Sequence, residues 1–490
     1  MKHRLFPQAA IFATCLLTYA IFWSGHQYSI DGIVMFQYAK ALAFQHSFQM
    51  DPPVRWGVDI AVSKWPLGLT LLYVPVLSFL SATFLSADKW IRKSPYNPDL
   101  HHHPGLLENE AYRYSSFINP VITAASAVVL YSLCRELGFS GKKAALAALI
   151  FGLLSPAAPY AKYDYAQPLA GLLLLLAILF LARSRRGGRR ALIVAGFCLG
   201  LAILARPEMV LAPGVILTGA ACLRSGKPGR LSGLFDRGRL LDLAAFVTPL
   251  AVSLLVNQAF NYYRYGGWLS FGYRPDFGFD LRLIGLAVLG NFLSPGRGLF
   301  FFFPLSLLSL PGFWSLYRKD RYAALLISLS FLSALLLYSA WSDWPAGLSW
   351  GPRLLLPYFP YLALLGVAGI SVLRQLPRWA ALGLAAALIL LGMVAAFQGL
   401  FYNFLVYYGR QPVSVGLPFR GAQHFSFGYS PLFAGWRAFG DPTWGDIYLW
   451  QVMTAQAHQV LLIGAMALGL VAVAWVWYFL RPSLEWLFSD

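Results

Sequence analysis

Two charged residues in the first polar stretch of the chain are of the right types for group-transfer chemistry. Asp31 follows the first hydrophobic segment, and Lys64 lies further along in the run Ser-Lys-Trp-Pro-Leu-Gly. A carboxylate can take the proton of an attacking hydroxyl or amine, and a nearby cation can stabilise an anionic leaving group. Each residue also has a purely structural interpretation. Asp31 could cap the helix that begins there, and Lys64 could pair with Asp59 in a solvated loop.

Three more charged residues stand in short polar turns. Asp164 lies in Lys-Tyr-Asp-Tyr, Arg297 in Ser-Pro-Gly-Arg-Gly and Arg353 in Trp-Gly-Pro-Arg. Arginine binds phosphate through two parallel hydrogen bonds, although both arginines could also simply reach toward the membrane surface. Asp164 could support a catalytic base, cap a helix, or bind a divalent metal ion with Asp31. Two carboxylates are few ligands for such an ion, so a metal is possible but no metal site is assigned.

The composition shows which class of protein must position these residues. Of 490 residues, 58% are hydrophobic and only 12% are charged, whereas soluble domains carry about 25% charged residues. Apolar stretches of roughly 20 residues, the length that crosses a bilayer as a helix, recur along the chain. We therefore expect an all-α polytopic membrane protein with one domain over residues 1–490. The four cysteines lie in or beside apolar stretches and are expected to be packing residues.

The net charge of +18 is gathered in short turns between the apolar stretches. Basic turns of this kind face the cytoplasm, so the charge does not indicate a nucleic-acid partner. The clusters are Arg135/Lys142/Lys143, Arg183–Arg190, Arg224–Arg239, Arg318–Arg321 and Arg374/Arg378.

Placing these turns inside predicts about twelve transmembrane helices with both termini in the cytoplasm. The long external loops then cover about 25–113, 260–298 and 401–456. The apolar stretch 66–85 becomes a helix on the outer surface, because counting it as a crossing would invert the basic turns that follow. The predicted spans are about 6–24, 114–134, 144–160, 168–183, 190–205, 208–223, 241–259, 299–316, 322–339, 354–373, 379–400 and 457–480.

This topology brings all the candidate residues to the external face. Charged groups at the edge of a membrane are costly and often mark a functional site. Arg206 and Glu208 also fall there, at the tip of a predicted helical hairpin, where they could form a self-contained ion pair. The candidate site residues are Asp31, Lys64, Asp164, Arg297 and Arg353.

In the order of these landmarks the chain resembles the GT-C superfamily of polyprenyl-phosphate-sugar-dependent glycosyltransferases. That superfamily includes the protein O-mannosyltransferases and the lipid A aminoarabinose transferases. The Asp31 segment is similar to the acidic motif of the family's first loop, with Gly32 in place of a second acidic residue. Asp164 matches the aspartate of the second loop. The stretches that resemble other family elements are Ser63–Gly68, Asn261–Gly272, Leu293–Leu299 and Trp344–Arg353, with Pro345-Ala346 departing from the usual glycine-rich spelling.

The resemblance implies an inverting sugar transfer from a polyprenyl-phosphate donor to a lipid, glycan or protein acceptor, on the outer face of a bacterial inner membrane. Asp31 would be the catalytic base and Asp164 a supporting acidic residue, while Lys64, Arg297 and Arg353 would bind the donor phosphate. A transporter or lipid flippase is an alternative, but it predicts charges deep within the spans and repeated halves. A lipid-carrier glycan ligase or polymerase would share the same charged residues.

Overall fold

The protein is described by a computed structural model that covers most of its helices. It describes residues 2–26, 28–50, 54–55, 59–60, 62–65, 67–83, 114–211, 214, 217–218, 237–268, 270, 278–409, 422–433 and 446. The expected span at 457–480 lies outside these residues, as does most of the one at 208–223.

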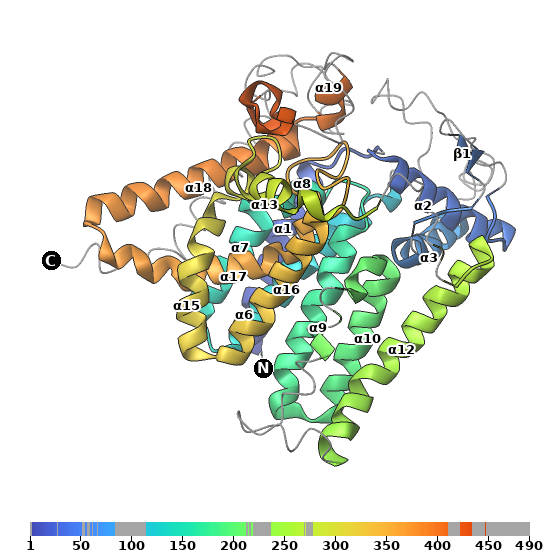
Figure 1. The fold of residues 1–490 in the computed structure, drawn as a ribbon, viewed down its shortest axis with the longest axis horizontal. Helices are drawn as coiled ribbons and strands as arrows, with labels where there is room; N and C mark the ends of the chain where they lie inside the picture. The colour runs from blue at the N-terminus through green and yellow to red at the C-terminus, as the bar shows by residue number, and fades with distance from the viewer. Residues whose placement is uncertain are drawn as a thin grey trace.

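Six described segments are long and apolar enough to cross a membrane. They form the bundle in Figure 1, so the expectation of an all-α polytopic membrane protein is confirmed. The segments are α6 (Ile118–Glu136), α9 (Gln167–Gly187), α12 (Arg237–Tyr265), α16 (Arg321–Ser339), the continuous run of η7 (Arg353–Tyr358), α17 (Phe359–Gly369) and η8 (Ile370–Gln375), and α18 (Arg378–Phe401).

The other helices complete the bundle and one of its ends. Their bounds are α1 (Lys2–Ile21), α2 (Ile30–Lys40), α3 (Leu67–Thr83), α7 (Gly141–Leu154), α8 (Ala157–Tyr160), α10 (Arg189–Ala205), α13 (Ile284–Leu293), α14 (Leu299–Phe302), α15 (Ser309–Lys319) and α19 (Phe404–Gly409). A π-helical turn at Ala41–Gln45 follows α2, and β1 (Val54–Arg55) pairs with β2 (Asp59–Ile60). The 3-10 turns are η3 (Pro207–Val210), η5 (Leu281–Leu283), η6 (Pro304–Leu308), η10 (Ala422–Phe425) and η11 (Phe427–Tyr429).

Several expected spans differ from the observed helices. The count of twelve is not confirmed, and the expected span 299–316 is divided into α14, η6 and α15. Proline causes the breaks, since its ring removes a hydrogen-bond donor and clashes with the preceding turn: Pro304 opens η6, and Pro156 separates α7 from α8. The external loop 260–298 contains an apolar helix, α13, that was expected to be loop.

Close helix contacts in the core depend on glycine. A Cβ atom on Gly312 of α15 would lie under 3.0 Å from the Leu365 carbonyl oxygen of α17, and one on Gly369 would meet the Leu308 carbonyl in the same way. Helices that lack a hydrophobic driving force between them associate through such small residues. The described cysteines Cys15, Cys134 and Cys198 are buried and unpaired, as expected for packing residues.

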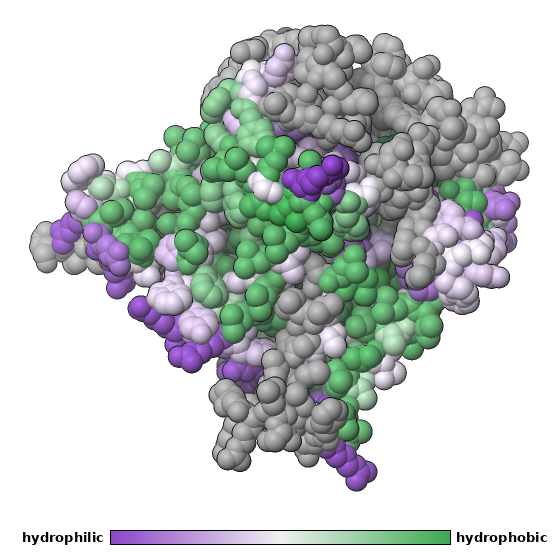
Figure 2. All heavy atoms as spheres, in the orientation of Figure 1, coloured by the Kyte–Doolittle hydropathy of each residue, from purple (hydrophilic) through white to green (hydrophobic). Residues whose placement is uncertain are grey.

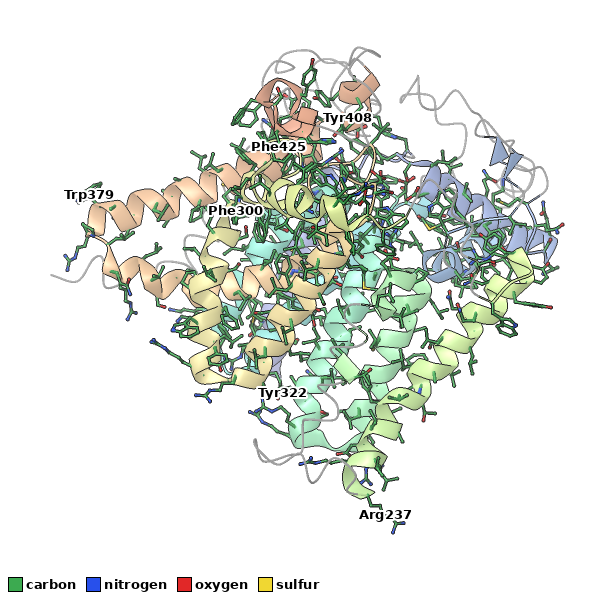
Figure 3. The ribbon with its side chains drawn as sticks, viewed as in Figure 1. Arg237, Phe300, Tyr322, Trp379, Tyr408 and Phe425 are labelled. Atoms are coloured by element: carbon green, nitrogen blue, oxygen red, sulfur yellow. The ribbon has the colours of Figure 1, made fainter. Side chains whose placement is uncertain are left out.

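The two ends of the bundle differ in their polar contacts. At one end, ion pairs join the basic turns: Arg185–Asp320 (2.5 Å), Arg186–Glu136 (3.2 Å) and Arg189–Asp242 (3.0 Å). The labelled residues Arg237, Tyr322 and Trp379 lie along this edge, from the left to the bottom of Figure 3. Figure 2 shows polar side chains on the same edge and apolar side chains over the flanks above it. We call this end, made by residues 135–143, 183–190, 237–242 and 318–321, the basic rim.

The opposite end of the bundle, the site rim, holds the N-termini of α2, α6 and α9 and the C-terminus of α10. The surface helix expected at 66–85 is observed as α3, which lies beside α2 at this rim and away from the basic rim (Figure 1). Its start packs against the end of α10, where a Cβ atom on Gly68 would overlap the backbone of Ala205.

Candidate active site

Asp31 lies in the first turn of α2, on the site rim. The Ser29 hydroxyl caps this helix by accepting a hydrogen bond from the Gly32 amide (3.0 Å), so Asp31 itself is not the N-cap. The Asp31 side chain is 17% exposed. The alternative that Asp31 serves as the helix cap is therefore wrong, and its carboxylate is left to face the site.

Asp164 holds the start of the same helix. Its carboxylate accepts hydrogen bonds from the Tyr28 amide (3.1 Å), the Ser29 amide (3.4 Å) and the Ser29 hydroxyl (2.9 Å). Burial raises the pKa of Asp164 to about 6, although the Ser29 and Tyr28 hydrogen bonds oppose the shift. Asp164 thus fixes the segment that positions Asp31.

Arg353 brings a cation to Asp31 from the start of η7. Its Nη1 atom lies 3.7 Å from Oδ2 of Asp31, and its guanidinium lies 4.4 Å from the centre of the Tyr165 ring. The side chain is 14% exposed, and its Nε atom has no hydrogen-bond partner in the part of the chain that the structure describes. A stacked guanidinium with an unused donor is suited to bind a phosphate.

The loop between α16 and η7, residues 340–352, is fastened through its carbonyl groups. Arg297 donates to the Ser349 carbonyl and to the Gly347 carbonyl (2.5 Å), and Tyr165 donates to Leu348 (3.1 Å). Tyr408, labelled at the top of Figure 3, donates to Ser349 as well (3.3 Å). Arg297 is only 1% exposed, so the structure shows it bracing the loop that leads to Arg353.

Asp343, near the start of this loop, is a further carboxylate of the site that was not predicted from the sequence. Burial raises the pKa of Asp343, while its hydrogen bond from the Gly347 amide (3.1 Å) and the Arg353 and Arg297 charges lower it, and Asp31 raises it further. Asp343 therefore shares one electrostatic environment with three predicted site residues. Its place directly before the quoted Trp344–Arg353 stretch was the available signal.

Lys64 precedes α3 on the site rim and is exposed, with its ammonium 4.9 Å from the centre of the Trp65 ring. Arg264, near the end of α12, holds this segment by donating to the carbonyls of Ser63 (2.6 Å) and Trp65 (3.1 Å). Arg264 belongs to the family-like stretch Asn261–Gly272, and the sequence alone did not predict this role. The segment that carries Lys64 is therefore fixed by an arginine from a distant helix.

Arg206 and Glu208 form the ion pair expected at the hairpin tip, with Nη2 and Oε1 2.5 Å apart. The pair is not isolated, however. The Tyr338 hydroxyl lies 3.4 Å from the Glu208 carboxylate, and Arg206 is close enough to Arg353 for the two positive charges to repel. A negatively charged ligand at Arg353 would relieve that repulsion.

The described residues do not form a metal site around Asp31. No group of three His, Cys, Asp or Glu residues in this part of the chain could hold a metal ion. The Asp164 carboxylate is turned toward two backbone amides, and Gly32 supplies no side chain.

Comparison with solved structures identifies the fold. No protein-family model matches the chain, and no curated protein matches it in sequence. Its structure is similar to that of ArnT from Cupriavidus metallidurans bound to undecaprenyl phosphate. The TM-score is 0.54, with 14% identity, over 97% of this chain and 76% of that one. The chain shares the fold of that ArnT structure.

The apo form of the same ArnT is similar to this chain with a TM-score of 0.53, 13% identity and the same coverage. The predicted resemblance to GT-C proteins is thus confirmed for the fold. Within this fold Asp31 lies beside Arg353, and Asp164 holds the start of the helix that carries Asp31. Arg297 binds the loop that leads to Arg353, and Lys64 precedes α3 on the same rim.

Proposed function

We propose that this protein is an inverting glycosyltransferase that takes a sugar from a polyprenyl-phosphate donor. The observation that carries the proposal is the pairing of a carboxylate, Asp31, with a stacked and partly unused guanidinium, Arg353, at the rim opposite the basic turns. The likeness in fold to an ArnT structure that binds undecaprenyl phosphate supports the same class of donor.

In this reaction the Asp31 carboxylate takes the proton of the acceptor hydroxyl or amine as that atom attacks the anomeric carbon. The bond from the acceptor to the anomeric carbon forms while the bond from that carbon to the phosphate oxygen breaks. The electron pair of the broken bond stays on the lipid phosphate, which Arg353 and Lys64 stabilise. No acid is needed, because the leaving phosphate is already a stable anion.

Two predicted residues take supporting places in this mechanism. Asp164 holds the amides at the start of α2 and so fixes the position of Asp31. Arg297 holds the carbonyls of the loop that ends at Arg353. Its terminal nitrogens are engaged with that loop, so its contribution to phosphate binding is indirect.

The positive-inside rule places the basic rim in the cytoplasm and the site on the exterior. In a bacterial inner membrane the exterior is the periplasm, where the acceptor would be a lipid, glycan or protein. The same geometry would suit a lipid-carrier glycan ligase or polymerase, which differs only in the size of the transferred group.

The test is transfer by purified protein in nanodiscs, supplied with a labelled polyprenyl-phosphate monosaccharide and cell-envelope lipids. The wild type is expected to transfer label, and Asp31→Asn to lose transfer by about a hundredfold or more. Asp280→Asn, which removes the charged partner of the exposed Arg282, is the matched control and should transfer normally. Full activity of Asp31→Asn would exclude the base, and no transfer by any form would favour a transporter or flippase.

A further inference from the structure

A second cluster of charges is buried beside the site and is not used by the proposed mechanism. Its centre is Asp446, which is 1% exposed and comes from the expected external loop 401–456. The Asp446 carboxylate contacts the His26 ring and the Tyr28 hydroxyl, and it pairs with Lys162 (3.0 Å). His26 and Tyr28 lie in the expected loop 25–113, and Lys162 lies in the short turn between α8 and α9, so one carboxylate joins three segments that are distant along the chain.

The cluster is bound tightly enough to hold its members in place. Lys162, itself 1% exposed, also donates to the Leu400 carbonyl at the end of α18 (2.7 Å) and to the Asp446 carbonyl (3.3 Å). Burial alone would raise the pKa of Asp446, but His26, Lys162 and Tyr28 hold that pKa well below its usual range. A buried charge left without such partners is strongly destabilising, so the cluster is expected to stay intact in the folded protein.

The cluster connects to Asp31 through one short segment of backbone. Tyr28 binds Asp446 with its hydroxyl, and its amide donates to Asp164 (3.1 Å). The next residue, Ser29, caps α2, and Asp31 follows in the first turn of that helix. Tyr28 is fixed at both ends, by one carboxylate through its side chain and by another through its backbone.

We propose that Asp446 is a positioning residue, which through Tyr28 fixes the start of α2 and thereby the place of Asp31. This inference rests on the proposed function, since it assumes that Asp31 is the base. Asp446 touches neither donor nor acceptor in this scheme. It makes residue 446 a part of the site, because Asp446 supplies the carboxylate that holds Tyr28.

The test compares Asp446→Asn and Tyr28→Phe with the wild type in nanodiscs. Turnover per folded molecule is measured in the labelled-donor assay, and undecaprenyl phosphate affinity is measured by tryptophan fluorescence. A displaced base slows the chemistry, so turnover should fall about tenfold to a hundredfold, while affinity for undecaprenyl phosphate stays within about twofold. Tyr28→Phe removes only the hydroxyl contact and decides the question if Asp446→Asn does not fold.

Asp242→Asn is the matched control, because it removes the buried partner of Arg189 at the basic rim. It should lower thermal stability without lowering turnover per folded molecule. The inference would be overturned if folded Asp446→Asn and Tyr28→Phe kept the turnover of the wild type. It would also be overturned if both variants lost turnover and undecaprenyl phosphate affinity equally. Asp31→Asn is run in parallel: its full activity would refute the base itself and with it this route. If Asp446→Asn keeps wild-type turnover while Asp31→Asn is inactive, the positioning role of Asp446 is refuted and the catalytic role of Asp31 stands.

Discussion

Gly32 packs against the carboxylate of Asp164. A Cβ atom on Gly32 would lie under 3.0 Å from Oδ2, Cγ and Cβ of Asp164. The family-like pattern places a second acidic residue after the first-loop aspartate, and in this chain that place is filled by a carboxylate from another loop. Asp164 can reach the amides of Tyr28 and Ser29 only because position 32 carries no side chain.

Gly32→Ala should therefore disrupt the site without touching any charged group. The added methyl group must push Asp164 away from the start of α2, and overpacking of this kind costs about 1–3 kcal/mol. We expect transfer to fall about tenfold or more, because Asp31 moves with the helix. The measurement is turnover of labelled donor in nanodiscs.

The control for this change is Gly383→Ala, in α18. A Cβ atom on Gly383 would meet nothing within 4 Å, so this substitution should leave transfer unchanged and stabilise the helix by about 1 kcal/mol. Equal activity of the two alanine variants would show that the packing of Gly32 on Asp164 does not position the base.

The sequence predicted the class of fold because its strongest signals are local. Apolar stretches and basic turns each report on a few residues, and they correctly placed Asp31, Asp164 and Arg353 on one rim. The breaks in the spans were harder to predict. The Pro156 and Pro304 breaks depend on how neighbouring helices satisfy the freed backbone groups, which a single sequence does not show.

The partners of the site residues could not be predicted either, because they are distant along the chain. Arg264 holds the Lys64 segment, and Asp446 holds Tyr28, across sequence separations that no spacing pattern reports. The Gly/Pro turn around Arg297 predicted that this residue binds phosphate, yet its guanidinium donates hydrogen bonds to backbone carbonyls. Charge and turn type identified the region of this residue but not the atoms it binds.

The raised pKa of Asp164 predicts how stability depends on pH. Its pKa is about 6 when folded, against an ordinary value of 3.8, so the fold favours the protonated form. Protonated Asp164 therefore adds roughly 3 kcal/mol to the free energy of unfolding, and this amount is fully present below pH 3.8. It is lost as the pH rises through about 6. Thermal unfolding in detergent from pH 4 to 7 should show the wild type losing stability relative to Asp164→Asn. A constant difference between the two would contradict the assignment.

Arg297→Lys separates bracing of the loop from direct phosphate binding. A lysine cannot reach both the Gly347 and the Ser349 carbonyls, so one buried acceptor is left unpaired at a cost of about 1–3 kcal/mol. We expect a lower melting temperature and slower transfer, with affinity for undecaprenyl phosphate little changed. A tenfold loss of that affinity with an unchanged melting temperature would instead make Arg297 a phosphate ligand.

Arg353→Gln should give the opposite pattern. Arg353 has an unused Nε donor and lies over Tyr165, so losing its charge should weaken undecaprenyl phosphate binding about tenfold to a hundredfold. The binding should also weaken less with salt than in the wild type, because one ionic contact is gone. Arg282→Gln, an exposed arginine whose partner is Asp280, is the control and should bind normally. Equal affinities of the two variants would remove Arg353 from the donor site.

The orientation of the two rims can be measured by labelling introduced cysteines in intact cells. Arg282 precedes α13 and its side chain is 91% exposed, whereas Arg318 is exposed on the basic rim. A membrane-impermeant maleimide should label Arg282→Cys in bacteria with a permeabilised outer membrane, and Arg318→Cys only after the inner membrane is opened. Burial of Cys15, Cys134 and Cys198 keeps their background low, and replacing Cys222 by serine removes the remaining thiol from the comparison. Reversed labelling would place the Asp31–Arg353 pair in the cytoplasm, where an external acceptor could not reach it.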